Sequence, residues 1–187
     1  MNSAAVVLDF RRTRARVSAL TVGNESGVYA VFTTARSALA PFAEPEDGLI
    51  YIGRSTDLAV REFDTHFDSS GNGFSTVRRS LGAILKQPLS LRAVPRSSGS
   101  SESNVRNFIF TPDGEERLTD WMLRNLEVAV HVAADIEQLE PLLIRQLRPL
   151  LNLNRWPNPD RAAIKRLRKM CADEARTVRS HHQRNKC

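Results

Sequence analysis

The stretch "LIYIGRS" at residues 49–55 is a short apolar run with a tyrosine inside it and a glycine near its end. Such a run predicts one buried strand that ends in a turn. A second phrase of similar build, "SGVYAVF" at residues 26–32, also carries a tyrosine directly after a glycine and a valine. We therefore expect two strands, over residues 28–33 and 49–53, and any function must account for both tyrosines.

The sequence on either side of these strands predicts further elements. The loop between them, "ARSALAPFAEPEDG", contains two prolines and an acidic cluster, which exclude a continued strand. Ser55 is a good N-cap for a helix over "TDLAVREFDTHF". The later elements are a helix from Ser75 to about Lys86, a short strand at "NFIF", a helix from Thr111 to about Asn125, a strand at "LEVAVHVAA", a helix at "DIEQLEPLLIRQL" and a basic helix from about Asp160.

The composition is that of a globular protein. Its 187 residues are 41% hydrophobic and 26% charged, which suits one domain with its own core and some additional sequence. No run of about 18 apolar residues occurs, so we expect no membrane-spanning helix. The two cysteines, Cys171 and Cys187, match no metal-ligand spacing. We interpret them as incidental thiols of a reducing, cytoplasmic compartment, and structural zinc is disfavoured.

Positive charge is concentrated at the C-terminal end of the chain. Residues 155–187 contain 10 Lys or Arg and 3 Asp or Glu, a balance of +7, whereas residues 1–154 have a balance of −1. A concentrated basic segment is the usual footprint of a polyanionic partner, although a solubilising tail has the same composition. The helix expected there is weakly amphipathic. Its expected apolar stripe consists of Ala162, Ala163, Leu167 and Met170.

A carboxylate interrupts the apolar face of the helix expected at residues 135–147. Apolar residues at positions 136, 139, 143 and 147 mark that face, and Glu140 falls on the same stripe. A buried, unpaired carboxylate costs several kcal/mol. Glu140 therefore either lies at the rim of the core with an arginine partner or coordinates a cation.

Three regions, "SGVYAVF", "GLIYIGRSTDLAVREF" and "LEPLLIRQLRPLLNLN", resemble in this order the motif regions of the GIY-YIG nuclease superfamily, over about residues 26–154. The first resembles the GIY element with valine in place of isoleucine, and the second contains YIG unchanged. Arg61, eight residues after Gly53, stands where the family places an arginine on its first helix. Glu140 and Asn152 keep the spacing of the family's acidic metal ligand and late asparagine.

The resemblance implies an α/β fold of the α+β type, with a small central sheet of three mainly antiparallel strands flanked by helices. It also implies hydrolysis of phosphodiester bonds with one divalent cation, Mg²⁺ or Mn²⁺, held by Glu140. Tyr29 would activate or position the attacking water, and Tyr51 would hydrogen-bond the water or the scissile phosphate. Arg61 would neutralise charge that develops on the phosphoryl oxygens, a role suited to an always-charged array of donors.

Two further residues, His66 and Asn152, are candidates for the site, and each has an alternative role. The family often carries a histidine or tyrosine four residues after the helix arginine, but this position is Thr65, and His66 follows it. One residue rotates a helix by about 100°, so His66 is expected in the site only where the helix is locally irregular. Asn152 either belongs to the site or ends the helical region through a turn.

These observations divide the chain into an N-terminal extension (1–25), a GIY-YIG-like domain (26–154) and a basic C-terminal helix with its tail (155–187). The leading functional prediction is a metal-dependent endonuclease of the restriction, repair or mobile-element kind. Its expected substrate is double-stranded DNA. The alternative is a non-catalytic nucleic-acid-binding module that retains the nuclease fold. The sequence leaves open DNA or RNA, the specificity of cleavage and whether the protein forms a homodimer.

Overall fold

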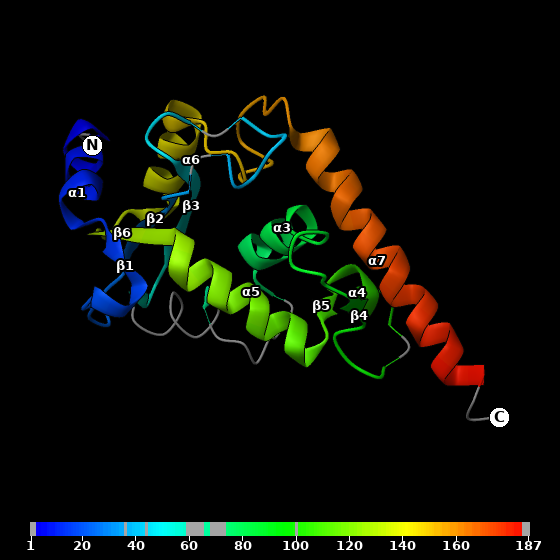
Figure 1. The fold of residues 1–187 in the computed structure, drawn as a ribbon. Coiled ribbons are helices and arrows are strands. Elements are labelled where there is room, and N and C mark those ends of the chain that lie inside the picture. Colours follow the sequence, from blue (N-terminus) through cyan, green and yellow to red (C-terminus); the bar gives the residue numbers. More distant parts are fainter. Residues whose placement is uncertain are drawn as a thin grey trace. The chain divides into compact units, whose positions relative to one another are not determined.

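The computed structural model describes residues 3–35, 37–43, 45–58, 66–67, 74–99 and 101–184, the last four of these without their side chains. Figure 1 labels the elements. The helices are α1 (Ser3–Thr13), the 3-10 helix η1 (Val17–Ala19), α3 (Thr76–Ile84), α4 (Glu102–Arg106), α5 (Pro112–Asn125), α6 (Ile136–Leu147) and α7 (Arg161–Arg184). The strands are β1 (Ala15–Arg16), β2 (Gly27–Thr33), β3 (Leu49–Ser55), β4 (Ala93–Val94), β5 (Ile109–Phe110) and β6 (Leu126–Val132). None of the helices in these ranges is long and apolar enough to cross a membrane.

The chain divides into two compact units, each made of two chain segments. Unit 1 comprises Met1–Phe67 and Trp121–Asp160, and unit 2 comprises Asp68–Asp120 and Arg161–Cys187. The N-terminal residues 1–25 contribute α1 and β1 to unit 1, where β1 is part of the sheet. Helix α7 belongs to unit 2.

Unit 1 is built on a four-stranded sheet with the order β1-β6-β2-β3, in which every neighbouring pair is antiparallel. The expected α+β fold is confirmed, with four strands in place of the three expected. The additional strand, β1, is two residues long and pairs Ala15 with Val128. Two residues show no alternation that could mark a strand in the sequence. In contrast, all seven residues of the interior strand β2 are buried.

Helices α1 and α6 pack on one face of this sheet (Figure 1). Side chains of a strand alternate between the two faces, and those of Val28, Ala30 and Phe32 point toward the helices. Tyr29, between Val28 and Ala30, therefore points to the opposite face. The core between sheet and helices comprises Val6, Phe10, Val28, Ala30, Phe32, Leu49, Ile52, Ala129, Ile136, Leu139, Leu143 and Ile144.

Polar contacts tie α1 to β6. His131 Nδ1 lies 2.6 Å from Asp9 Oδ2, and this hydrogen bond, with a smaller effect of the Arg12 charge, lowers the pKa of Asp9. The Thr13 hydroxyl donates to the carbonyl oxygen of Val130 at 3.1 Å. Both contacts hold α1 on the strand, which gives His131 a structural role.

In unit 2, helix α7 packs against α3, α4 and β4, and β4 pairs with β5 (Figure 1). Helix α3 begins as the sequence predicts, because Ser75 Oγ accepts a hydrogen bond from the backbone N–H of Arg78 at 3.1 Å. The Arg78 side chain is buried and forms an ion pair with buried Glu115 of α5. Arg78 Nη1 also donates to Thr119 Oγ1 at 3.0 Å. A hydrogen-bonded ion pair therefore lies inside unit 2.

Helix α7 begins at Arg161, as its basic pattern predicts, but its buried stripe differs from the expected one. Ile164, Cys171 and Ala175 are buried, whereas Met170 is 58% exposed. The small side chains of Cys171 and Ala175 let α7 approach its neighbours closely, which leaves the longer Met170 outside. Burial raises the pKa of the Cys171 thiol to about 11, so this thiol is protonated and inert at neutral pH.

Candidate active site

Tyr29 and Tyr51 lie side by side on the face of the sheet opposite α1 and α6. Their strands are antiparallel neighbours, and the register pairs Tyr29 with Gly53 and Val31 with Tyr51. Residues paired in this way share a face of the sheet. The two ring centroids are 6.0 Å apart. The two predicted strands are therefore confirmed, and both hydroxyl-bearing rings are available to one site.

His66 adds a third ring, and we call these residues the Tyr-Tyr-His cluster (Tyr29, Tyr51 and His66). His66 Nε2 lies 2.9 Å from the Tyr29 hydroxyl oxygen, and its ring centroid is 5.7 Å from that of Tyr29 and 6.3 Å from that of Tyr51. The histidine is 6% exposed. The structure thus brings His66 to Tyr29 in spite of its one-residue offset in the sequence. Arg61, the other site residue expected from this segment, lies outside the described residues.

Gly53 makes room for the Tyr29 ring. A Cβ atom at residue 53 would lie 2.2 Å from both Cζ and the hydroxyl oxygen of Tyr29, far inside van der Waals contact. Because glycine has no side chain, the tyrosine ring can lie against the backbone of β3. The glycine of "YIG" therefore leaves the space that the tyrosine on the neighbouring strand occupies. The sequence gives no sign of this dependence.

Asn152 joins the chain after α6 to β3, the edge strand of the sheet. Its Nδ2 donates to the carbonyl oxygen of Ile52, and its Oδ1 accepts from the backbone N–H of Ile52, both at 2.8 Å. The side chain is 7% exposed. Ile52 lies between Tyr51 and Gly53. Both polar atoms of the Asn152 side-chain amide therefore hold the backbone that carries Tyr51 and lies against the Tyr29 ring. We infer that Asn152 is a positioning residue.

Replacing Asn152 by alanine is expected to lower the free energy of unfolding of unit 1 by about 2 kcal/mol, because buried backbone groups of Ile52 lose their partner. Urea unfolding followed by tryptophan fluorescence measures this, since Trp121 and Trp156 both belong to unit 1. Asn154→Ala, at an exposed position two residues along, should stay within about 0.5 kcal/mol of the wild type. Equal stabilities of the two variants would contradict the positioning role.

Glu140 lies on α6 with 16% of its side chain exposed. Its Oε2 is 3.7 Å from Nε of the half-exposed Arg155, which is the arginine partner that the rim alternative requires. Three residues earlier, Glu137 forms an ion pair with Arg54 of β3 at 3.1 Å, so this side of α6 faces the edge strand. The contact of Glu140 with Arg155 is long, which makes Arg155 a partner that a cation can displace.

A metal ion at Glu140 would depend on few protein ligands. Within the ranges that the structure describes, no group of three His, Cys, Asp or Glu side chains could hold a metal ion. An ion bound by a single carboxylate completes its shell with water and substrate oxygens, as Mg²⁺ commonly does. The donor set therefore fits Mg²⁺ or Mn²⁺ and does not fit a structural zinc centre.

A comparison with known protein families agrees with this geometry. The profile of the GIY-YIG catalytic domain matches residues 27–170, which is more than half of the chain and includes every expected site residue. The chain belongs to the GIY-YIG family. No curated protein and no solved structure matches the chain significantly. Because the GIY-YIG domain is a nuclease domain, the substrate that the family implies is a nucleic acid.

The GIY-YIG match ends within α7, whereas the resemblance seen in the sequence ends at residue 154. The first part of α7, residues 161–170, therefore lies within the matched range. Segments of both units belong to the matched range.

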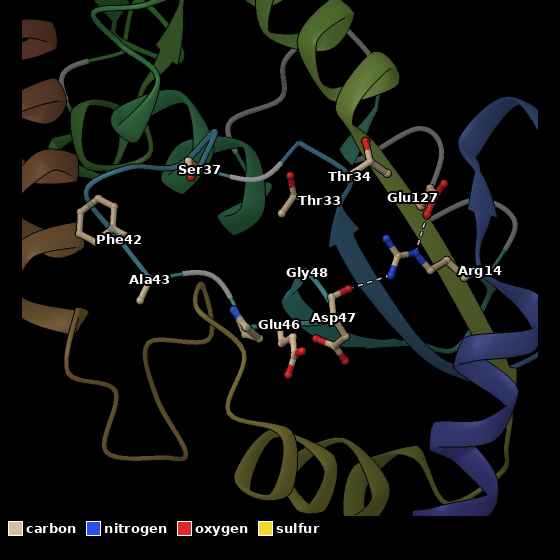
Figure 2. A pocket seen from close by; sticks show the side chains of 11 residues that line it. Arg14, Thr33, Thr34, Ser37, Phe42, Ala43, Glu46, Asp47, Gly48 and Glu127 are labelled. Atoms are coloured by element: carbon tan, nitrogen blue, oxygen red, sulfur yellow. Dashed lines mark hydrogen bonds and ion pairs between the residues drawn. The ribbon is translucent and has the colours of Figure 1, made fainter.

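A cavity of about 560 Å³ lies at the turn end of β2 and β3 (Figure 2). Figure 2 shows Arg14 between the carbonyl oxygen of Asp47, at 2.8 Å from its Nη1, and the carboxylate of Glu127. None of the GIY-YIG site residues that the structure describes lines this cavity. The carboxylates of Glu46, Asp47 and Glu127 in its lining would repel a phosphate. We therefore do not assign it to the active site. The described residues of the lining are Arg14, Thr33, Thr34, Ser37, Phe42, Ala43, Pro45, Glu46, Asp47, Gly48 and Glu127.

Proposed function

We propose that this protein is a metal-dependent endonuclease that hydrolyses phosphodiester bonds in double-stranded DNA. The observation that carries the proposal is the hydrogen bond between Tyr29 and His66 beside the ring of Tyr51, in a chain of the GIY-YIG family. A phenol hydroxyl that is hydrogen-bonded to an imidazole can pass a proton to that imidazole.

In the proposed reaction, Tyr29 and His66 act together as the proton acceptor. The attacking water gives a proton to the Tyr29 oxygen while the Tyr29 hydroxyl proton passes to an unprotonated His66 Nε2. The distance of 2.9 Å between these two atoms is within reach for direct transfer. The water oxygen bonds to phosphorus, the bond from phosphorus to the leaving oxygen breaks, and that oxygen takes a proton from solvent. The Tyr51 hydroxyl donates to a non-bridging phosphate oxygen.

Glu140 is proposed as the protein ligand of Mg²⁺ or Mn²⁺. When bound, the cation would offset negative charge on the phosphate oxygens. A rim position, with 16% of the side chain exposed, allows a hydrated ion to reach the carboxylate. Arg155 would then leave Glu140 and become available to the substrate. Arg61 keeps the role expected from the sequence, as a cationic donor to the phosphoryl oxygens.

The exposed surface of α7 supports a duplex as the substrate. Arg161, Lys165 and Lys169 are exposed and recur at every fourth residue, so they lie along one side of the helix. A row of cations complements the regular phosphate backbone of a duplex and supplies affinity without sequence information. Lys169 also forms an ion pair with Asp173, which it would exchange for a phosphate. A homodimer stays a prediction, which sedimentation equilibrium would test.

One observation favours a second candidate, a non-catalytic module that only binds nucleic acid. The ion pair of Glu140 with Arg155 neutralises the carboxylate without any metal. In such a module the Tyr-Tyr-His cluster would contact a phosphate, and no bond would break.

A plasmid assay separates the two candidates. The protein is incubated with supercoiled plasmid in Mg²⁺ or in Mn²⁺, with and without a chelator, and a parallel sample contains single-stranded RNA of mixed sequence. We expect nicked and linear plasmid only in the samples that contain Mg²⁺ or Mn²⁺ without the chelator. Retarded but intact plasmid in every metal would favour the binding module, and cleavage of RNA alone would overturn the assignment to DNA.

Tyr29→Phe is expected to lower the single-turnover cleavage rate by roughly 10²-fold, because the variant lacks only the hydroxyl through which the proton passes. The Tyr29 ring and its packing against Gly53 stay in place. Circular dichroism and plasmid affinity in Ca²⁺ serve as controls, and both should match the wild type. A variant that cleaves at the wild-type rate would remove Tyr29 from the chemical step.

A further inference from the structure

Three arginine side chains of unit 2 come from distant parts of the chain to one place. Arg79 lies on α3, Arg96 follows β4, and Arg168 lies on α7. Helix α7 packs against both α3 and β4, and Arg79 lies near enough to Arg168 and Arg96 for both charges to act on it. We call them the arginine cluster (Arg79, Arg96 and Arg168).

The arginine cluster is deep for a group of like charges. Arg79 is 8% exposed, and Nη1 of Arg96 is shielded from solvent and has no hydrogen-bond partner in the described part of the chain. Burial, followed by the like charges of Arg168 and Arg96, lowers the pKa of Arg79 to about 10. Burial also lowers the pKa of Arg168. Like charges held together away from water are costly, because each is desolvated and each repels the others.

Carboxylates of unit 2 form ion pairs with cations outside the cluster. Neither Arg96 nor Arg168 lies within ion-pair distance of any described carboxylate. Their positive charge is therefore not neutralised by these side chains. The pairs are Arg78 with Glu115, Lys86 with Glu174, Arg117 with Asp113, Lys169 and Arg176 with Asp173, and Arg176 and Arg179 with Glu102.

The guanidinium of Arg96 is held in a defined orientation. Its Nη2 donates to Asn104 Oδ1 at 3.2 Å, and its backbone N–H donates to the Asn104 carbonyl oxygen at 2.9 Å. The ring of Phe74 lies over the same guanidinium, with 4.3 Å between Cζ and the ring centroid. These contacts leave the donors of Nη1 unused, so Arg96 is preorganised for an acceptor that the described residues do not provide.

We propose that the arginine cluster binds one phosphodiester group of the nucleic-acid substrate, at a site additional to the Tyr-Tyr-His cluster. The substrate class in this inference rests on the proposed function. A phosphodiester offers one negative charge and two non-bridging oxygens, which suit the planar donor array of guanidinium groups. The anion would offset the repulsion among the three cations and give Arg96 Nη1 an acceptor. Such a contact orients the substrate and carries no sequence information.

Inorganic phosphate serves as the first probe, with Tm as the readout. We expect phosphate to raise the Tm of the wild type above its value in chloride at equal pH and ionic strength. The rise should be lost in Arg168→Gln and in Arg96→Gln and kept in Arg92→Gln, which removes an exposed charge of unit 2. Circular dichroism checks the fold of each variant. No rise in the wild type, or equal rises in all four proteins, would overturn the proposal.

Duplex DNA serves as the second probe, in a chelator so that no cleavage occurs. The slope of log affinity against log salt concentration should flatten by about 0.9 in Arg168→Gln, the amount expected for one lost phosphate contact. The slope of Arg92→Gln should equal that of the wild type. Parallel lines for the wild type and Arg168→Gln would overturn the proposal. A rise in Tm with phosphate but no change in slope would assign the cluster to free phosphate and would also overturn it.

Failure of this proposal is distinguishable from failure of the proposed function. If the wild type cleaves plasmid but the cluster variants bind DNA as it does, only the phosphodiester site is wrong. If the wild type binds DNA with the expected difference in slope but never cleaves it, the phosphodiester site stands and the nuclease proposal is wrong.

Discussion

Glu140→Gln is expected to lower the single-turnover rate of plasmid cleavage by about 10³-fold or more. The change keeps the shape of the side chain and removes the negative charge that would hold Mg²⁺ or Mn²⁺. A catalytic metal ion contributes several kcal/mol to the transition state, and about 4 kcal/mol corresponds to a factor of 10³ in rate. The fold should be unaffected, since the Arg155 partner is half-exposed and returns to water. Cleavage is measured with protein in excess over plasmid, so that binding does not limit the rate.

Glu137→Gln is the matched control for this experiment. Glu137 lies on the same helix, is exposed, and pairs with Arg54 instead of Arg155. Its rate should stay within about threefold of the wild type, as surface ion pairs contribute little. Raising the Mn²⁺ concentration should restore part of the activity of Glu140→Gln. It should leave the rate of Glu137→Gln unchanged. If both variants cleave equally fast, Glu140 does not hold the metal.

Glu115→Gln is expected to lower the free energy of unfolding by about 3–5 kcal/mol, the usual cost of leaving a buried charge without its partner. Arg78 and Glu115 are both buried and form an ion pair. Glu115 Oε1 also accepts from the backbone N–H of Phe110 at 2.8 Å, a bond that glutamine can keep. The change therefore isolates the loss of charge beside Arg78. Urea unfolding followed by circular dichroism gives the magnitude.

Glu116→Gln controls for the position on α5, because Glu116 is the next residue and is exposed. It should change the free energy of unfolding by no more than about 0.5 kcal/mol. The double variant Arg78→Met with Glu115→Gln should lose less free energy of unfolding than the two single variants lose together. In the double variant no charge is left without a partner in the interior. Additive effects of the two changes would show that the pair does not act as a unit.

The sequence predicted those parts of the site that depend on local pattern. Tyr29 and Tyr51 were placed on two strands because each phrase is a continuous apolar run, and the structure pairs these strands directly. Ser75 and Thr111 marked helix starts because cap chemistry is read from neighbouring residues. The α+β class followed from the family resemblance and is confirmed.

The features that the sequence did not predict depend on residues far apart in the chain. The fold places His66 against Tyr29. A regular helix over the expected residues would have turned His66 away from the site, because of its one-residue offset. Asn152 uses its amide on Ile52, a partner one hundred residues away, so counting residues in the motif could not separate a positioning role from a chemical one. The roles of Tyr29, Tyr51, Arg61, His66 and Glu140 in the reaction stay predictions.

The place of β6 in the sheet determines when, during synthesis of the chain, the proposed active site can form. This strand lies between β1 and β2, although it follows both in the sequence by about ninety residues or more. A growing chain that has not yet reached residue 126 holds β2 with an open edge, and one that has not reached Asn152 lacks the amide that holds Ile52. The ribosome must therefore complete most of unit 1 before the two tyrosines are fixed, so shorter nascent chains should be unable to cut nucleic acid near their site of translation.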